Sequence, residues 1–128
     1  LTKALLPALT RAPSGRLLFT ASSVGRQGRA YWGAYAVSKF AIEGLMQTLA
    51  DELANTTAIR VNSLNPGGTR TAMRQAAYPA ERPDSVPGPE TIMPAYLFLF
   101  SDEAQPIHGQ ALNAREFDPV QWLADCSA

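Results

Sequence analysis

Tyr35 and Lys39 stand four residues apart, a spacing that places their side chains on one face of a helix, one turn from each other. A phenol beside an ammonium group gives up its proton more readily, because the cation stabilises the phenolate. Such a pair can exchange a proton with a substrate near neutral pH. The spacing therefore predicts acid–base chemistry.

Ser22 and Ser23 lie upstream of this pair in a polar loop. A hydroxyl in that loop could meet the same substrate oxygen as the phenol of Tyr35. Ser22 and Ser23 are competitors for this role, because neighbouring loop positions can exchange roles. We therefore expect a serine–tyrosine–lysine set.

A strand, a loop and a helix must position these three side chains. Residues 16–21 form a short apolar run, typical of a strand buried on both faces in a parallel sheet. Residues 22–33 contain three glycines and predict a loop beyond the carboxyl end of that strand, where α/β sheets bind ligands. Residues 34–53 repeat apolar side chains at helical spacing and predict a long amphipathic helix.

The rest of the chain repeats this alternation of helix and strand. Helices are predicted over residues 1–9 and 90–100, and further strands over 58–64 and 111–114. Residues 78–89 hold four prolines and few apolar side chains, which indicates a mobile binding loop. The sequence thus predicts an α/β protein with a parallel sheet.

Composition narrows the class of function. The chain has 128 residues, 46% of them hydrophobic, which suits one domain or a part of one. Its 11 basic and 11 acidic residues give no overall field toward nucleic acid or a membrane, so the expected partners are small molecules and protein. A single cysteine, Cys126, fits a reducing cytoplasm, and the longest apolar stretch falls short of the roughly 20 residues of a membrane span. No signal peptide is visible, and we expect a cytoplasmic protein.

Several other residues invite a functional interpretation. His108 has no metal-ligand neighbours in the sequence, so we expect a turn residue and no metal site. Glu43 lies one turn beyond Lys39, and we expect an exposed salt bridge between the two. Tyr31 and Trp32 are expected to serve in packing, although their position before Tyr35 would suit a pocket wall.

Three segments in order, TASSVG (20–25), YAVSK (35–39) and NPGGTRT (65–71), resemble the short-chain dehydrogenase/reductase family. The similarity runs from residue 1 to about residue 114. It implies an α/β fold that is the C-terminal part of a Rossmann-like, doubly wound parallel sheet with flanking helices. Residues 1–128 would then be the C-terminal, catalytic portion of one NAD(P)-binding domain.

The resemblance also implies an activity and a role for each matching residue. The activity is hydride transfer between NADP or NAD, with NADP favoured, and a carbonyl or alcohol substrate. Ser22 would polarise the carbonyl, Tyr35 would transfer the proton, and Lys39 would assist Tyr35 and bind the nicotinamide ribose. The nicotinamide end of the cofactor would be held by a second group of residues, namely Pro66, Gly67, Gly68, Thr69 and Thr71.

The sequence departs from the family pattern at both ends. The glycine-rich turn that receives the cofactor pyrophosphate does not occur in it, so the N-terminal cofactor half is absent from these residues. Ala114, Arg115 and Glu116 stand where the family often has Asp-Gly-Gly. A non-catalytic scaffold or inactive fragment acting through protein contacts is the alternative function, and a homodimer or homotetramer is expected for the full-length enzyme.

Overall fold

A parallel sheet of three strands forms the centre of the protein. The computed structural model describes residues 1–126, and its strands are β1 (Arg16–Thr20), β2 (Arg60–Asn65) and β3 (Ala111–Asn113), in the order β1-β2-β3. Leu18 lies opposite Asn62, and Leu64 lies opposite Leu112. The predicted parallel sheet is confirmed.

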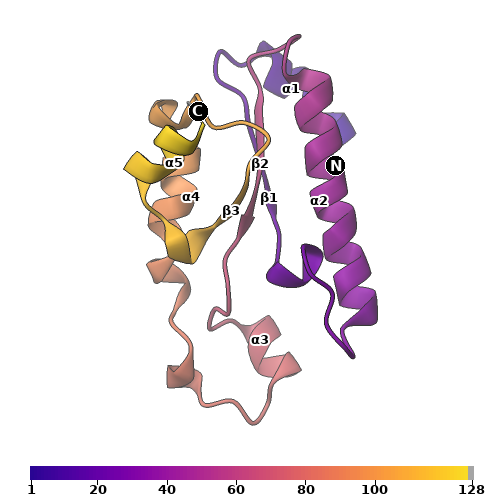
Figure 1. The fold of residues 1–128 in the computed structure, drawn as a ribbon, viewed down its shortest axis with the longest axis vertical. Coiled ribbons are helices and arrows are strands. Elements are labelled where there is room, and N and C mark those ends of the chain that lie inside the picture. Colours follow the sequence, from indigo (N-terminus) through magenta and orange to yellow (C-terminus); the bar gives the residue numbers. More distant parts are fainter. Residues whose placement is uncertain (127–128) are drawn as a thin grey trace.

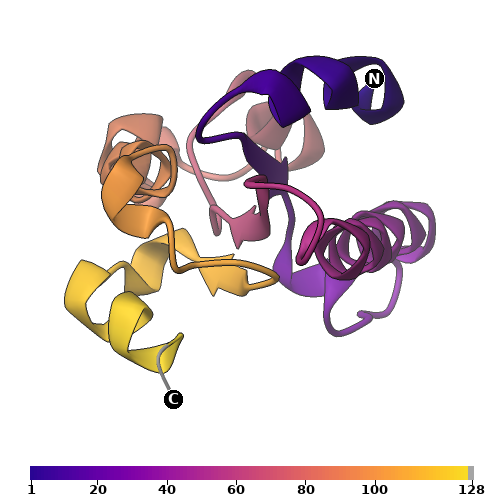
Figure 2. The same ribbon diagram turned by 90° about the horizontal axis from the view of Figure 1, so that it is seen from above.

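Helices cover both faces of this sheet, as Figures 1 and 2 show. Helices α1 (Thr2–Arg11) and α2 (Gly33–Leu53) pack on one face, and α4 (Met93–Leu99) and α5 (Pro119–Asp125) on the other. The predicted α/β class, a parallel sheet with flanking helices, is therefore confirmed.

Each face of the sheet has its own hydrophobic core, because successive strand residues point to opposite sides. Leu17 and Phe19 of β1 join the core under α1 and α2, whereas Leu18 joins the core under α4 and α5. Cys126 packs against this second core, and burial raises the pKa of its thiol.

The two long strands differ from each other in their burial. Strand β1, predicted to be buried on both faces, is half-buried along most of its length because, among residues 1–126, only β2 pairs with it. Strand β2 lies between two neighbours and buries four consecutive residues, including the polar Asn62 and Ser63. The Asn62 side chain donates to Ile107 O and accepts from the Gln110 N–H, so its burial leaves no polar group unpaired.

Short elements gather beyond the carboxyl ends of the strands. They are the 3₁₀ turns η1 (Ser23–Gly25), η2 (Pro83–Ser85) and η3 (Pro89–Thr91) and the helix α3 (Ala72–Ala77), drawn at the bottom of Figure 1. The helix predicted over residues 90–100 is split into η3 and α4. Two further turns, η4 (Asp102–Ala104) and η5 (Ala114–Glu116), flank β3.

Helices α3 and α5 are not among the elements predicted from the sequence. Both are short, and each begins at a side chain that accepts hydrogen bonds from the first helical N–H groups, Thr71 in α3 and Asp118 in α5. Among residues 1–126, no helix combines the length and the apolar character needed to span a bilayer.

Candidate active site

A cavity of about 1020 Å³ opens at the carboxyl ends of β1 and β2. The three predicted catalytic residues, Ser22, Tyr35 and Lys39, all line it. So do the five residues predicted to hold the nicotinamide, which are Pro66, Gly67, Gly68, Thr69 and Thr71. The fold thus brings together every predicted site residue, from three separate segments.

Tyr35 lies in the first turn of α2, at the mouth of the cavity. Its side chain is 37% exposed, and its ring meets that of Trp32 edge-on with 5.7 Å between centroids. Trp32 directly precedes the helix and also lines the cavity, so the pocket-wall role considered for it from the sequence agrees with the structure.

Lys39 lies one helical turn after Tyr35, as the spacing predicts. Its ammonium nitrogen is 5.7 Å from the centroid of the Tyr35 ring and donates a 2.9 Å hydrogen bond to Thr20 O at the end of β1. This bond fixes the cation between the helix and the sheet, on the side of the phenol.

Ser22 and Ser23 both line the cavity, at the start of the η1 turn. The turn packs closely on α2, since a Cβ atom added at Gly25 would lie 2.7 Å from the backbone carbonyl of Lys39. The serine loop and the lysine helix are therefore held at a fixed separation, and either serine hydroxyl remains a candidate for the substrate oxygen.

The turn after β2 favours glycine because of its backbone conformation. Gly67 has a φ of 70°, which disfavours side chains, and it lies against the flexible Arg115 side chain. Asn65 Oδ1 accepts a 3.0 Å hydrogen bond from the Gly67 N–H, and Arg115 donates to Gly68 O. Arg115 lies in the segment that departs from the family pattern, and its hydrogen bond helps to hold the turn.

The opposite wall of the cavity comes from α3 and the loop after it. Arg74 donates two hydrogen bonds of 2.6 and 2.7 Å to the Glu81 carboxylate and lies over the Tyr78 ring. These bonds lower the pKa of Glu81 and raise that of Arg74. No residue of α3 is buried, so this wall rests on surface contacts.

Tyr31 stands at the rim of the cavity in an unusual backbone conformation. Its φ is 69°, and its ring is fully exposed. A left-handed conformation costs a bulky residue on the order of 1–3 kcal/mol. Tyr31 therefore adds aromatic surface to the mouth of the cavity without packing into a core.

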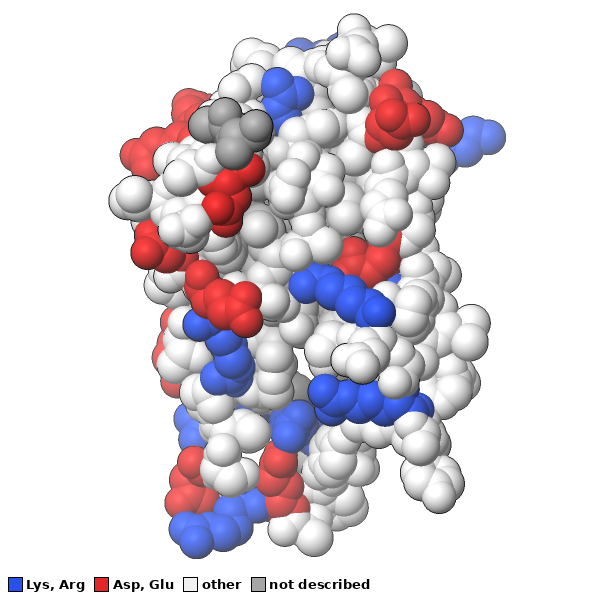
Figure 3. All heavy atoms as spheres, viewed as in Figure 1, with Lys and Arg blue, Asp and Glu red and all other residues white. Residues whose placement is uncertain are grey.

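The charged side chains that line the cavity are basic, and one of them, Arg74, is paired with Glu81. Arg29, Lys39 and Arg74 line it, and no aspartate or glutamate of the described residues does. On the face shown in Figure 3, most basic side chains lie over the lower half of the molecule, where α3 and the start of α2 lie in Figure 1. Such a lining suits a ligand that carries phosphate groups.

Glu43 was expected to form an exposed salt bridge with Lys39, and this prediction is wrong. Glu43 is 5% exposed and pairs with Arg26 at 2.7 Å, because its position on α2 faces the sheet. Lys39 reaches Thr20 instead. The sequence alone does not identify Arg26 as part of the site, because its partners lie far along the chain and no local pattern predicts them.

His108 has a structural role, in line with the expectation from the sequence. Its Nδ1 accepts from the Val61 N–H of β2 at 3.2 Å, and its Nε2 lies 2.8 Å from Ala50 O of α2. In the described part of the chain, no cluster of three or more histidine, cysteine or acidic side chains is arranged to hold a metal ion.

Comparison with known proteins gives the class to which this site belongs. The family model described as short chain dehydrogenase matches residues 1–82. The chain belongs to the short-chain dehydrogenase family.

Particular relatives agree with this assignment. The uncharacterized oxidoreductase YciK of Escherichia coli is 56% identical over 115 residues, which cover 90% of this chain and 45% of YciK. The 3-oxoacyl-[acyl-carrier-protein] reductase FabG of Salmonella typhimurium is 35% identical, with coverage of 88% and 49%. The chain therefore spans about half the length of these curated relatives.

Solved structures share the fold at high similarity. A short-chain dehydrogenase from Shigella flexneri, complexed with NADP, superposes with a TM-score of 0.85 at 55% identity, covering 89% of this chain and 47% of that one. Another, from Pseudomonas syringae, has a TM-score of 0.85 at 63% identity, with coverage of 88% and 46%. The chain thus shares the Rossmann-like fold of these proteins over about half of their length.

Proposed function

We propose that the intact protein is an NADP-dependent oxidoreductase that interconverts a carbonyl group and an alcohol. The observation that carries this proposal is the convergence of Ser22, Tyr35 and Lys39 on one cavity with the glycine turn after β2. The relative from Shigella flexneri complexed with NADP and one from Escherichia coli complexed with NADPH favour NADP over NAD.

The donor set of the cavity fits a nicotinamide cofactor. The cationic lining suits its phosphates, Lys39 would hold the nicotinamide ribose, and the backbone of residues 66–69 with the Thr71 hydroxyl would hold the nicotinamide end. When bound, the cofactor supplies or accepts the hydride. The chain itself then has to orient the carbonyl and move a proton.

Tyr35 and Ser22 share that task. The Tyr35 hydroxyl donates its proton to the substrate oxygen in reduction and takes it back in oxidation, while Ser22 polarises the same oxygen by donating a hydrogen bond. Lys39 stabilises the phenolate that remains on Tyr35, because its ammonium group is held by Thr20 O on the side of the ring.

We also propose that residues 1–128 are the C-terminal portion of one cofactor-binding domain. The free edge of β1 supports this proposal, because among residues 1–126 only β2 pairs with β1. Further strands, with the glycine-rich cofactor turn, would pair along that edge.

A homodimer or homotetramer is proposed for the intact protein, supported by exposed apolar side chains on α2 such as Val37 and Phe40. Light scattering of the intact protein tests the oligomer, and a monomer would contradict it.

The decisive experiment replaces Tyr35 with phenylalanine in the intact protein. Only the hydroxyl is lost, so NADPH binding should survive while turnover of a panel of aldehydes and ketones falls by about 10²–10⁴-fold. Tyr78→Phe is the matched control, because Tyr78 lines the same cavity and has no proposed proton to move. Near-normal turnover by Tyr35→Phe would refute the mechanism.

The same assay assigns the serine role. Ser22→Ala should lower turnover and leave NADPH affinity unchanged, whereas Ser23→Ala should change neither. The reverse result would transfer the role to Ser23, which lines the cavity beside Ser22.

A further inference from the structure

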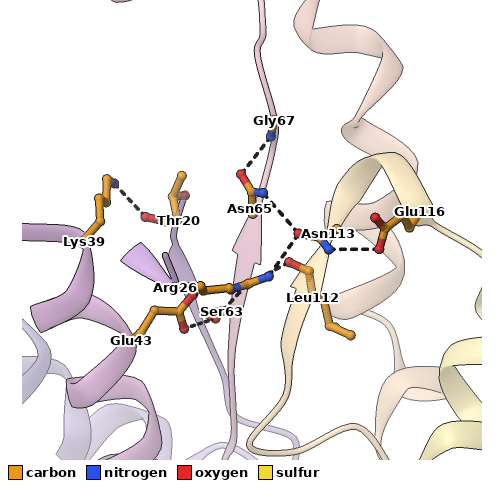
Figure 4. Close-up of polar contacts among 10 residues, drawn as sticks. All are labelled: Thr20, Arg26, Lys39, Glu43, Ser63, Asn65, Gly67, Leu112, Asn113 and Glu116. Carbon is orange, nitrogen blue, oxygen red and sulfur yellow. Dashed lines mark hydrogen bonds and ion pairs between the residues drawn. The ribbon is translucent and has the colours of Figure 1, made fainter. Parts of the chain in front are cut away.

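We propose that Arg26 is a positioning residue that holds helix α2 and the turn of Pro66 and Gly67 at a fixed separation. Figure 4 shows the hydrogen bonds that run from the helix to the turn through the Arg26 guanidinium. The inference rests on the proposed function. In that function, helix α2 and the turn would bind the nicotinamide half of the cofactor, and these contacts hold the two in place.

On the helix side, Arg26 is held by the buried carboxylate of Glu43. The Arg26 Nε donates to Glu43 Oε1 at 2.7 Å, and the Ser63 hydroxyl donates to Glu43 Oε2 at 2.6 Å. Glu43 lies one turn after Lys39 on α2, so these bonds tie the stretch of helix that carries Lys39 to strand β2.

On the sheet side, the same guanidinium reaches β3. Its Nη1 donates to Asn113 Oδ1 at 3.0 Å, and its Nη2 donates to Leu112 O at 3.0 Å. Helix α2 and strand β3, which are distant in the chain, thus meet at one planar group that directly follows η1. The fork geometry of arginine makes these contacts possible at once, which the single ammonium of lysine does not.

Asn113 connects the Arg26 guanidinium to the turn through Asn65. Its Oδ1 also accepts a 3.1 Å hydrogen bond from Asn65 Nδ2, and Asn65 Oδ1 accepts from the Gly67 N–H at 3.0 Å. Gly67 lines the cavity, and Asn113 Nδ2 is itself held by Glu116 Oε2 at 2.9 Å. A displacement of the guanidinium would therefore move Asn113 and, through Asn65, the backbone of the turn.

Stability alone is a weak explanation for this arrangement. A buried ion pair loses much of its attraction to the cost of desolvation, so apolar side chains of similar volume often stabilise a core equally well. The network instead connects two walls of one cavity. The two explanations differ in their predicted effect on ligand binding.

The test compares two ligands of the intact protein by calorimetry, NADPH and adenosine 2′,5′-bisphosphate. The bisphosphate keeps the adenine end of NADPH and lacks the nicotinamide half. Arg26→Lys keeps a cation for Glu43 but loses the fork, and Asn113→Ala breaks the link to Asn65 while leaving the Arg26–Glu43 pair in place. Both variants should bind NADPH about tenfold more weakly, the loss of roughly one hydrogen-bonded contact, and bind the bisphosphate as the unmodified protein does.

Arg60→Lys is the matched control. Arg60 lies at the other end of strand β2 and donates to Gln105 O at 2.8 Å, away from the cavity. Its replacement should leave both affinities unchanged.

Each remaining outcome has a definite meaning. Equal loss of affinity for both ligands, or unfolding of both variants, would assign the network to fold stability and overturn the inference. Unchanged NADPH binding by both variants would overturn it as well. Failure of the unmodified protein to bind NADPH would instead refute the proposed function, and the inference with it.

Discussion

The two walls of the cavity are built in different ways. The wall that carries Tyr35 and Lys39 is a long helix with five buried residues, tied to the sheet by the buried Glu43. The wall formed by α3 and its following loop has no buried residue in α3 and is held by the partly exposed pair of Arg74 and Glu81. The side chains proposed for acid–base chemistry thus lie on the wall with more buried contacts, here called the rigid wall, whereas fewer buried contacts hold the other, here called the adaptable wall.

The largest difference between the walls should appear in the free energy of unfolding when the carboxylate of each wall, Glu43 or Glu81, is removed. Glu43→Ala leaves the half-buried Arg26 guanidinium without its ion-pair partner and should lower the free energy of unfolding by about 3 kcal/mol, the low end for a buried pair. Glu81→Ala should have far less effect, because the Glu81 side chain is 26% exposed whereas that of Glu43 is 6% exposed, and pairs in contact with solvent contribute little. Urea unfolding of the two variants checks this, and similar losses would mean that the walls are equally anchored.

A smaller effect is expected from close packing within the rigid wall. Gly25→Ala places a methyl group 2.7 Å from the Lys39 carbonyl, so η1 must shift from α2 at a cost of about 1–3 kcal/mol, with loss of turnover. Gly28→Ala is the control, since nothing lies within 4 Å of a Cβ atom there. Thermal unfolding and turnover should change only in the first variant, and two equal variants would show that the contact tolerates overpacking.

The sequence predicts the site better than it predicts the contacts that hold it. The positions of Ser22, Tyr35 and Lys39 follow from local spacing and from the order of strand, loop and helix, and all three line the cavity. Arg26 and Asn113 could not be identified, because they are 87 residues apart and only the fold joins them. Asn65 was identifiable in principle, since an asparagine two residues before a glycine turn often accepts a backbone hydrogen bond.

The burial of the strands shows the same limit. The apolar run in β1 predicts burial on both faces, yet burial also depends on how many strands pair with it, and among residues 1–126 that is β2 alone. The adjacent polar residues Asn62 and Ser63 of β2 are buried because their side chains find hydrogen-bond partners in Ile107 and Glu43. The spacing of apolar residues in the sequence predicts which strand side chains are apolar. It does not predict which other strands or side chains each strand will contact.

The smallest expected effect is the loss of the Arg74–Glu81 ion pair, which holds the adaptable wall, at acidic pH. Hydrogen bonds from Arg74 lower the pKa of Glu81 below 4.5, its ordinary value, so the ion pair stabilises the folded state above that pH and is lost as the pH falls through the lowered pKa. We expect the NMR signal of the Arg74 Nε–H to change in this range. Glu81→Gln should abolish the change, and a transition that persists in this variant would assign it to another group.

His108 gives this protein an internal spectroscopic probe. Because the Val61 N–H donates to Nδ1, the ring proton must sit on Nε2, from which it can reach Ala50 O. Residues 1–128 contain no other histidine, so within this part of the protein one imidazole resonance reports whether the middle of the long helix stays on the central strand. Nitrogen chemical shifts distinguish the two tautomers, so the contact of the helix with the sheet can be followed during ligand binding.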